Sequence, residues 1–230
     1  MLYLLDTANR QEIGALVERF PIAGVTTNPT IVARESEPFE ELVRGIRTAI
    51  GPGRMLQVQT SCEDPARIVE EALALRDLAG AAFFAKVPVT AAGIQAIMRL
   101  KKQGVGVTAT CVFTQQQALI AARAGADFVA PYVNRLDNIA SNGVAVVKDI
   151  VHLFRVHDLP TRVLAASFKN VEQVHEVSMA GAHCATVAPE LLKLLIYHPL
   201  TNMSVAEFKK DGPVCPRWSS DVEPEALYER

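Results

Sequence analysis

The chain has 230 residues, half of them hydrophobic, and 23 basic and 25 acidic residues give it a formal net charge of −2. Because charges of both signs are mixed along the chain, it offers no field that would collect nucleic acid or an anionic membrane, and we expect a small-molecule partner. The length and hydrophobic content exclude a disordered chain and indicate one large domain with a sizeable core.

Short apolar runs alternate with longer amphipathic segments along almost the whole chain. We expect eight strands, at Leu2–Asp6, Gly24–Thr26, Met55–Gln59, Ala81–Lys86, Gly106–Thr110, Phe128–Tyr132, Arg162–Ser167 and His183–Val187. We expect eight helices after them, at Gln11–Arg19, Phe39–Ile50, Pro65–Asp77, Ala91–Lys102, Gln115–Ala124, Val144–Val156, Val171–Ala180 and Glu190–Ile196. Eight strand–helix pairs predict an α/β fold, a single (β/α)8 TIM barrel over residues 1–200. A doubly wound open sheet is the alternative, although the chain lacks a Gly-rich phosphate loop.

Residues 201–230 follow the eighth pair. They contain a predicted helix at Val205–Lys210 and then an irregular tail from Gly212 that includes the lone Trp218. We expect this segment to pack on a neighbouring subunit, with the chain's own barrel end as the alternative contact.

Signals for targeting and for metal binding are weak. The N-terminus has no basic segment before a long apolar run, and no apolar stretch approaches the ~20 residues of a membrane span. The five histidines show no metal-ligand spacing, so we predict no metal. Widely spaced cysteines favour reduced thiols in the cytoplasm over a disulfide framework or a zinc site; they are Cys62, Cys111, Cys184 and Cys215.

Polar side chains end almost every predicted strand. In a TIM barrel the active site gathers at the carboxyl ends of the strands, so we expect these side chains to surround one cavity. Single residues also have structural interpretations, since Asp6 is suited to cap the first helix and Asn28 to begin a turn before Pro29. Their coincidence at seven of the eight strands favours a shared site. The candidates are Asp6, Thr26, Asn28, Gln59, Lys86, Thr110, Tyr132, Arg135, Ser167 and Lys169.

Lys86 is the most informative candidate. It ends an apolar run and precedes Val87-Pro88-Val89, a setting that places its ammonium among apolar walls. Desolvation lowers the pKa of a lysine from about 10.4 and so prepares a neutral amine to attack a carbonyl. A lysine that extends to solvent at the barrel rim is the structural alternative.

Five motifs occur in order and at barrel spacing between Leu2 and Val187. They read Asp6-Thr7-Ala8-Asn9, Gly24-Val25-Thr26-Thr27-Asn28-Pro29-Thr30-Ile31, Lys86-Val87-Pro88-Val89-Thr90, Ala130-Pro131-Tyr132-Val133-Asn134-Arg135 and Ala165-Ala166-Ser167-Phe168-Lys169. Together they resemble the transaldolase superfamily, and specifically its fructose-6-phosphate aldolase branch.

The resemblance implies a class I aldol mechanism that needs no metal or other cofactor. Lys86 would attack the C2 carbonyl of a ketose or sugar phosphate, and cleavage between C3 and C4 would leave a dihydroxyacetone enamine on Lys86. Gln57 lies on the same strand face as Gln59 and is the alternative residue for holding the catalytic water. The resemblance implies water-holding roles for Gln59, Thr110 and Tyr132, hydroxyl-binding or proton-transfer roles for Asp6 and Asn28, a pocket wall at Thr26, and phosphate binding by Arg135, Ser167 and Lys169.

Two positions favour the aldolase branch. Transaldolases of this superfamily usually carry Glu where Gln59 aligns and Phe where Tyr132 aligns, and the Tyr132 hydroxyl adds a donor for protonating or releasing the enamine. The resemblance therefore implies an aldolase that releases dihydroxyacetone. The alternatives are a transaldolase that transfers this unit and a non-catalytic phosphosugar-binding barrel. Because members of the branch form rings, we expect a homo-oligomer, such as a decamer.

Overall fold

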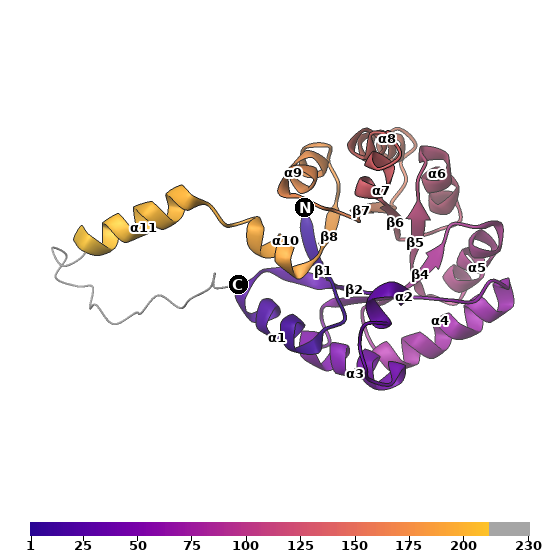
Figure 1. Cartoon of the computed structure of the whole chain (residues 1–230). Helices are drawn as coiled ribbons and strands as arrows, with labels where there is room; N and C mark the ends of the chain where they lie inside the picture. The colour runs from indigo at the N-terminus through magenta and orange to yellow at the C-terminus, as the bar shows by residue number, and fades with distance from the viewer. Residues whose placement is uncertain (212–230) are drawn as a thin grey trace. The chain divides into compact units, whose positions relative to one another are not determined.

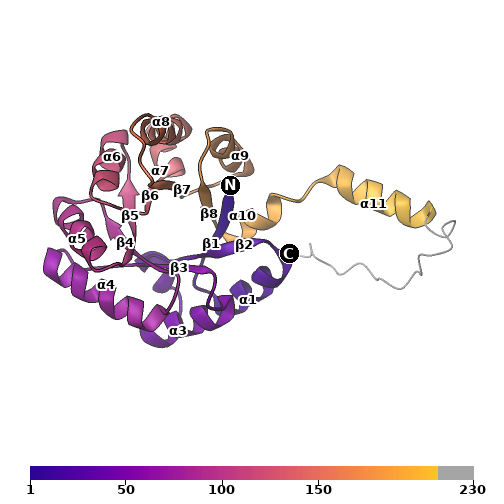
Figure 2. The same cartoon turned by 180° about the vertical axis from the view of Figure 1, so that it is seen from behind.

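The strands of the computed structural model, which describes residues 1–211, close into a barrel. They are all parallel and hydrogen-bond in chain order, and β8 returns to β1. Helices surround the strands in both views (Figure 1, Figure 2). The predicted TIM barrel is confirmed, and the open sheet is wrong. The strands are β1 Leu2–Asp6, β2 Ile22–Thr26, β3 Met55–Gln59, β4 Phe83–Pro88, β5 Gly106–Val112, β6 Phe128–Pro131, β7 Arg162–Ala165 and β8 Cys184–Val187.

The helices follow the predicted pattern with two additions. The short helices α2, Pro29–Val32, and α7, Val133–Asp137, were not expected, and they lie closer to the barrel axis than the outer helices do (Figure 1). None of the helices within residues 1–211 is both long and apolar enough to cross a membrane. The others are α1 Arg10–Arg19, α3 Phe39–Ile50, α4 Pro65–Ala79, α5 Ala91–Lys102, α6 Gln115–Arg123, α8 Gly143–Val156, α9 Val171–Met179, α10 Pro189–Leu194 and α11 Pro199–Asp211.

The chain divides into two compact units, Met1–Leu192 and Lys193–Arg230. The first unit is the barrel. The second contains α11, which begins six residues earlier than the predicted helix at Val205–Lys210. The irregular tail with Trp218 lies outside the described residues, and its packing on a neighbouring subunit stays a prediction.

Local signals set the limits of the helices. The Thr90 hydroxyl accepts a hydrogen bond from the Gly93 backbone N–H at 3.0 Å and caps α5. Thr114 caps α6 and forms a reciprocal capping box with Gln117. Glycines with a positive φ follow three of the helices, because a residue without a Cβ adopts that conformation at little cost. These are Gly104, Gly125 and Gly181.

A cluster of large side chains fills the amino-terminal end of the barrel. Phe128, the first residue of β6, is fully buried, and its ring and the Phe84 ring form a T-shaped pair with a centroid distance of 5.2 Å. The Arg162 guanidinium lies 4.2 Å from the centroid of the Phe128 ring. This packing closes one end of the barrel, so the space that remains lies at the carboxyl ends of the strands.

A close contact of α5 with the end of β4 gives a test of the packing. A Cβ atom at Gly93 would lie 1.9 Å from the Pro88 carbonyl oxygen, whereas one at Gly14 in α1 would meet nothing within 4 Å. We predict that Gly93→Ala lowers the free energy of unfolding by about 2 kcal/mol, because α5 must move away from β4. Gly14→Ala, the matched control, should raise it by about 1 kcal/mol. Urea denaturation followed by circular dichroism measures both, and a Gly93→Ala protein of unchanged stability would contradict this contact.

Candidate active site

A cavity of about 320 Å³ lies at the carboxyl ends of the strands. With one exception, Lys169, every site residue predicted from the sequence lines it. Lys169 is exposed, and its backbone N–H donates a hydrogen bond to the Gln173 side chain at the start of α9. The predicted residues that line the cavity are Asp6, Thr26, Asn28, Gln59, Lys86, Thr110, Tyr132, Arg135 and Ser167.

Lys86 lies inside this cavity on β4, and its side chain is buried. Only 5% of the residue is exposed, so the alternative of a lysine that reaches bulk solvent at the rim is wrong. Its Nζ atom donates a hydrogen bond of 2.6 Å to the Thr27 carbonyl oxygen. Burial lowers the pKa of Lys86, while the Asp6 carboxylate acts in the opposite direction. A neutral amine is therefore accessible closer to neutral pH than for an ordinary lysine.

Asp6 is the last residue of β1, and its pKa is shifted in the opposite direction to that of Lys86. Burial raises the pKa of this carboxyl group, and the Lys86 charge and a hydrogen bond from Thr26 partly counter that effect. The Thr26 hydroxyl donates to Asp6 Oδ1 at 2.7 Å. Asp6 does not cap the first helix, because Asn9 caps α1 by accepting from the Glu12 backbone N–H. The opposed shifts make Asp6 and Lys86 a pair suited to exchanging protons.

Tyr132 and Thr110 form a hydroxyl pair on the far side of the cavity. Their oxygen atoms lie 2.9 Å apart, and the Cys111 Sγ atom is 3.7 Å from the Tyr132 hydroxyl. Burial raises the pKa of Tyr132 to about 12. At neutral pH the hydroxyl therefore keeps its proton and serves as a hydrogen-bond donor or as a weak acid.

The two glutamines of β3 occupy different depths. Gln59 pairs with Lys86 in the strand register and lines the cavity, and its Oε1 atom is buried with no hydrogen-bond partner among residues 1–211. Gln57 pairs with Phe84 one layer deeper, is fully buried, and accepts a hydrogen bond of 2.9 Å from Thr108. Gln59 is thus the glutamine that faces the cavity, which favours it for holding water. That role stays a prediction.

Arg135 and Ser167 bring a cation and a hydroxyl to the same wall. Arg135 lies on α7, and its guanidinium is 4.8 Å from the centroid of the Tyr132 ring. Ser167 follows β7 with a left-handed backbone, φ 63°, a conformation that costs about 1–3 kcal/mol for a residue other than glycine. Its carbonyl accepts a hydrogen bond of 2.8 Å from the Asn134 backbone N–H, which fixes α7 against the end of β7.

Asn28 has two functions at the end of β2. Its Oδ1 atom caps α2 by accepting from the Ile31 backbone N–H at 3.1 Å, so the structural interpretation of this residue is confirmed. The side chain also lines the cavity. Because the oxygen caps the helix, the amide nitrogen remains as the group that can donate to a ligand.

Sequence reasoning missed three polar residues of the cavity, and Thr30, which follows Pro29 in α2, is the first of them. Thr186 lies on β8, the one strand that contributed no candidate, because that apolar run ends at Val187. Cys111 lies beyond the predicted end of its strand at Thr110, and β5 in fact continues to Val112. The remaining lining residues are apolar: Pro29, Ala130, Leu164 and Ala166.

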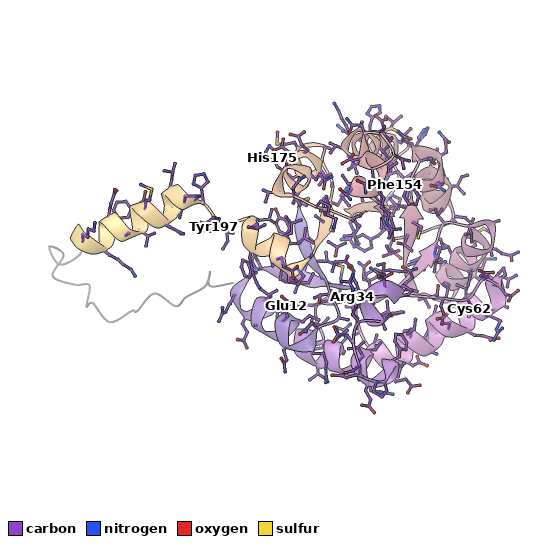
Figure 3. All side chains as sticks on the ribbon, in the orientation of Figure 1. Glu12, Arg34, Cys62, Phe154, His175 and Tyr197 are labelled. Atoms are coloured by element: carbon purple, nitrogen blue, oxygen red, sulfur yellow. The ribbon has the colours of Figure 1, made fainter. Side chains whose placement is uncertain are left out.

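The described residues offer no cluster of metal-binding side chains. No group of three or more His, Cys, Asp and Glu side chains within residues 1–211 is arranged to hold a metal ion. His175 on α9 lies in the outer layer of helices, and Cys62 lies toward the outer edge of the barrel (Figure 3).

Comparison with known proteins gives consistent matches over nearly the whole chain. The family model described as transaldolase/fructose-6-phosphate aldolase matches residues 3–221. A "Probable fructose-6-phosphate aldolase" of Streptococcus pneumoniae is 40% identical over 212 residues, which cover 92% of this chain and 96% of that protein. A "Probable transaldolase" of Alkaliphilus metalliredigens is 35% identical over 212 residues, with coverage of 92% and 97%. A solved structure described as "Native KDPGal structure" has a TM-score of 0.59 over 93% of this chain and 94% of that one, and at 17% identity it supports the fold alone.

The opposed pKa shifts of Asp6 and Lys86 give a test of their interaction. Asp6→Asn removes the carboxylate that favours the Lys86 ammonium, so the pKa of Lys86 should fall further. Reductive methylation of Lys86 by formaldehyde, which needs the neutral amine, should then extend to lower pH. Mass spectrometry of the Lys86 peptide measures the midpoint. The control Asp77→Asn, at an exposed site on α4, should leave it unchanged, and an unchanged midpoint in Asp6→Asn would show that the two groups do not interact.

Proposed function

The chain belongs to the transaldolase/fructose-6-phosphate aldolase family, an enzyme family that works through a Schiff base, and we propose that it cleaves and forms the C3–C4 bond of fructose 6-phosphate or a related ketose through an imine on Lys86. Dihydroxyacetone is the three-carbon unit. The observation that carries the proposal is the buried amine of Lys86, whose pKa is lowered, in the same cavity as the Asp6 carboxyl group.

Formation of the imine is the first step. The neutral Lys86 amine attacks the C2 carbonyl of the ketose, and the carbinolamine that results loses water to give a protonated imine. The leaving hydroxyl group takes a proton, and the hydroxyls of Thr110 and Tyr132 are suited to provide it because Tyr132 is protonated at neutral pH. The buried Oε1 atom of Gln59, which has no partner in the described part of the chain, is suited to hold the water that is released.

Cleavage of the C3–C4 bond is the second step. The Asp6 carboxylate accepts the proton of the C4 hydroxyl, the C3–C4 electron pair moves into the protonated imine, and the aldehyde product leaves. The raised pKa of Asp6 supports this role, since a carboxylate with a higher proton affinity is the stronger base. Protonation of the enamine at C3 and hydrolysis of the imine then release dihydroxyacetone and restore the Lys86 amine.

The phosphate of the substrate is assigned to Arg135 and Ser167. A guanidinium and a hydroxyl on one wall of the cavity match the charge and the acceptor oxygens of a phosphate. The amide nitrogen of Asn28 is assigned to a substrate hydroxyl, because its oxygen caps α2. Lys169 lies outside the cavity lining and is not assigned a contact with the substrate.

Two features favour aldolase over transaldolase as the main activity. The residue that faces the cavity from β3 is an uncharged Gln59, and Tyr132 adds a hydroxyl 2.9 Å from Thr110. Both features favour hydrolysis of the three-carbon intermediate on Lys86. The competing reaction, in transaldolases, is transfer of this unit to an acceptor aldehyde. Transaldolase activity on the same scaffold is the second candidate, because relatives carry either name.

Assembly and location form a further part of the proposal. We place the enzyme in the cytoplasm as a homo-oligomer. The described cysteines Cys62, Cys111 and Cys184 form no disulfide, which suits a reducing compartment. Taken by itself, α11 exposes Leu200 and Phe208 to more than 60%, which suits a helix that is covered by another chain. A mass in solution equal to one 25.0 kDa chain would exclude the oligomer.

The imine itself can be trapped. We predict that borohydride in the presence of dihydroxyacetone or fructose 6-phosphate attaches the three-carbon or hexose unit to Lys86, because only an imine is reduced to a stable secondary amine. Lys86→Met should abolish trapping and turnover while circular dichroism shows an intact fold, and Lys101→Met, at the other end of the barrel, serves as the matched control. An unmodified Lys86, or near-normal turnover in Lys86→Met, would refute the proposed mechanism.

Product analysis separates the two activities. We predict that fructose 6-phosphate alone yields dihydroxyacetone, because the Lys86 enamine is protonated and hydrolysed inside the cavity. Enzymatic quantification of the released ketone, with and without erythrose 4-phosphate as acceptor, provides the measurement. Strict dependence on the acceptor would assign the enzyme to transaldolase activity instead.

A further inference from the structure

Three side chains from three neighbouring strands form a hydrogen-bonded series inside the cavity. The Thr186 Oγ1 atom lies 2.6 Å from Thr26 Oγ1, and the Thr26 hydroxyl lies 2.7 Å from Asp6 Oδ1. β8 and β2 flank β1 on its two sides, so the series crosses β1 on the inner face of the barrel. Both threonines are buried, with exposed fractions of 4% for Thr186 and 0% for Thr26.

The chemistry of the three side chains determines which group donates in each hydrogen bond of the series. An ionised carboxylate only accepts hydrogen bonds, and a threonine hydroxyl carries one hydrogen. Since Thr26 gives its hydrogen to Asp6, the contact between the threonines requires Thr186 to donate to Thr26. If Asp6 takes up a proton and donates it to Thr26, both hydroxyls must turn around. The orientation of the series is therefore coupled to the charge on Asp6.

We propose that Thr186 is a positioning residue for the aldol reaction, which holds the Thr26 hydroxyl on Asp6 and so maintains that carboxylate as an ionised base. This inference rests on the proposed function of Asp6 in cleaving the C3–C4 bond. Thr186 acts through Thr26, since its hydroxyl bonds to Thr26 and not to Asp6 itself.

The hydrogen bond from Thr26 matters for the charge of Asp6 because Asp6 is buried. Desolvation favours the neutral form of Asp6, and the hydrogen bond from Thr26 is one of the two interactions that oppose it. Without a donor at position 186, the Thr26 oxygen loses the partner that keeps its own hydrogen directed at Asp6. A hydrogen-bond series among buried groups is cooperative, so loss of the terminal donor weakens the bond to the carboxylate.

Two substitutions separate the hydroxyl from the space that the side chain fills. Thr186→Val keeps the shape and removes the donor, whereas Thr186→Ser keeps the donor. For Thr186→Val we expect kcat to fall about ten-fold with KM changed less than about two-fold, because the base and not the binding of substrate is affected. The acidic limb of the kcat–pH profile should move upward by roughly half to one pH unit, since Asp6 must be ionised to act and its pKa rises. Thr186→Ser should restore the profile and most of kcat.

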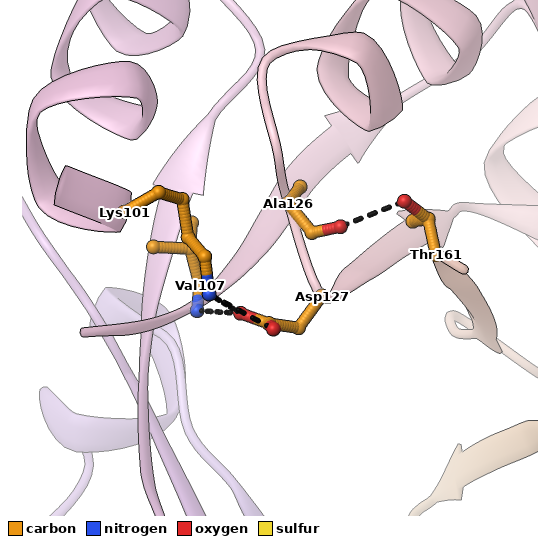
Figure 4. A network of polar contacts seen from close by, with 5 residues as sticks. All are labelled: Lys101, Val107, Ala126, Asp127 and Thr161. Carbon is orange, nitrogen blue, oxygen red and sulfur yellow. Dashed lines mark hydrogen bonds and ion pairs between the residues drawn. The ribbon is translucent and has the colours of Figure 1, made fainter. Parts of the chain in front are cut away.

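A matched control lies at the other end of the barrel. The buried Thr161 hydroxyl donates to the Ala126 carbonyl at 2.8 Å, next to the Lys101–Asp127 ion pair (Figure 4). Thr161→Val therefore loses a buried hydroxyl and its hydrogen bond without touching the cavity, and it should leave both kcat and the pH profile unchanged.

The Asp6→Asn variant tests whether Thr186 acts through Asp6. In Asp6→Asn the carboxylate is absent, so adding Thr186→Val should cause no further loss of kcat and no shift of the acidic limb. Additive losses in the double variant would place Thr186 outside the series and overturn the proposal.

The remaining outcomes distinguish this inference from the proposed function. If the wild-type protein is not trapped by borohydride with dihydroxyacetone, the proposed function fails. If the wild type and Thr186→Val are both trapped on Lys86 but their kcat and pH profiles agree, the function stands and the positioning role of Thr186 is overturned. Equal impairment of Thr186→Val and Thr186→Ser would overturn it as well, because packing would then explain the loss.

Discussion

The burial of one amine beside one carboxyl group is the constraint on which the rest of the site depends. Taking Lys86 out of water disfavours its charged form, and taking Asp6 out of water disfavours its charged form too, so the two buried groups compete for a proton. Each of the two buried groups needs a hydrogen-bond partner to stabilise it. The Thr27 carbonyl supports the lysine and the Thr26 hydroxyl supports the aspartate, and both come from the end of β2.

Barrel closure is what brings these groups together. The register of the parallel strands sets Gln59 beside Lys86 and Thr26 beside Asp6, at positions far apart in the sequence. Because every strand points the same way, each adds its last side chains to one rim. The opposite end is closed by Phe128 and its neighbours, so the polar groups at this rim act in a space with one entrance.

Much of this arrangement was predictable because its signals are local. Polar residues at strand ends identified the cavity, and apolar neighbours identified Lys86 as buried. Thr186 was missed because the last residue of its run is apolar, and a polar residue one position earlier resembles any strand residue. The choice between Gln57 and Gln59 needed the depth of each in the barrel, which the strand pattern alone does not give. Lys169 was included by its closeness in sequence to Ser167, whereas the left-handed turn at Ser167 changes the direction of the chain before Lys169 is reached.

Asn28 both caps α2 and lines the cavity, and this limits how the substrate range of the enzyme can change. Because its side-chain oxygen caps α2, a replacement that suits a new sugar also disturbs the backbone beside β2. Leu164 and Ala130 line the same space with apolar side chains that form no hydrogen bonds, and altering their size changes the shape of the cavity with no polar partner lost. Efforts to redirect the enzyme toward other ketoses are therefore best begun on the β6 and β7 wall, where the shape of the cavity can be altered without removing a hydrogen bond.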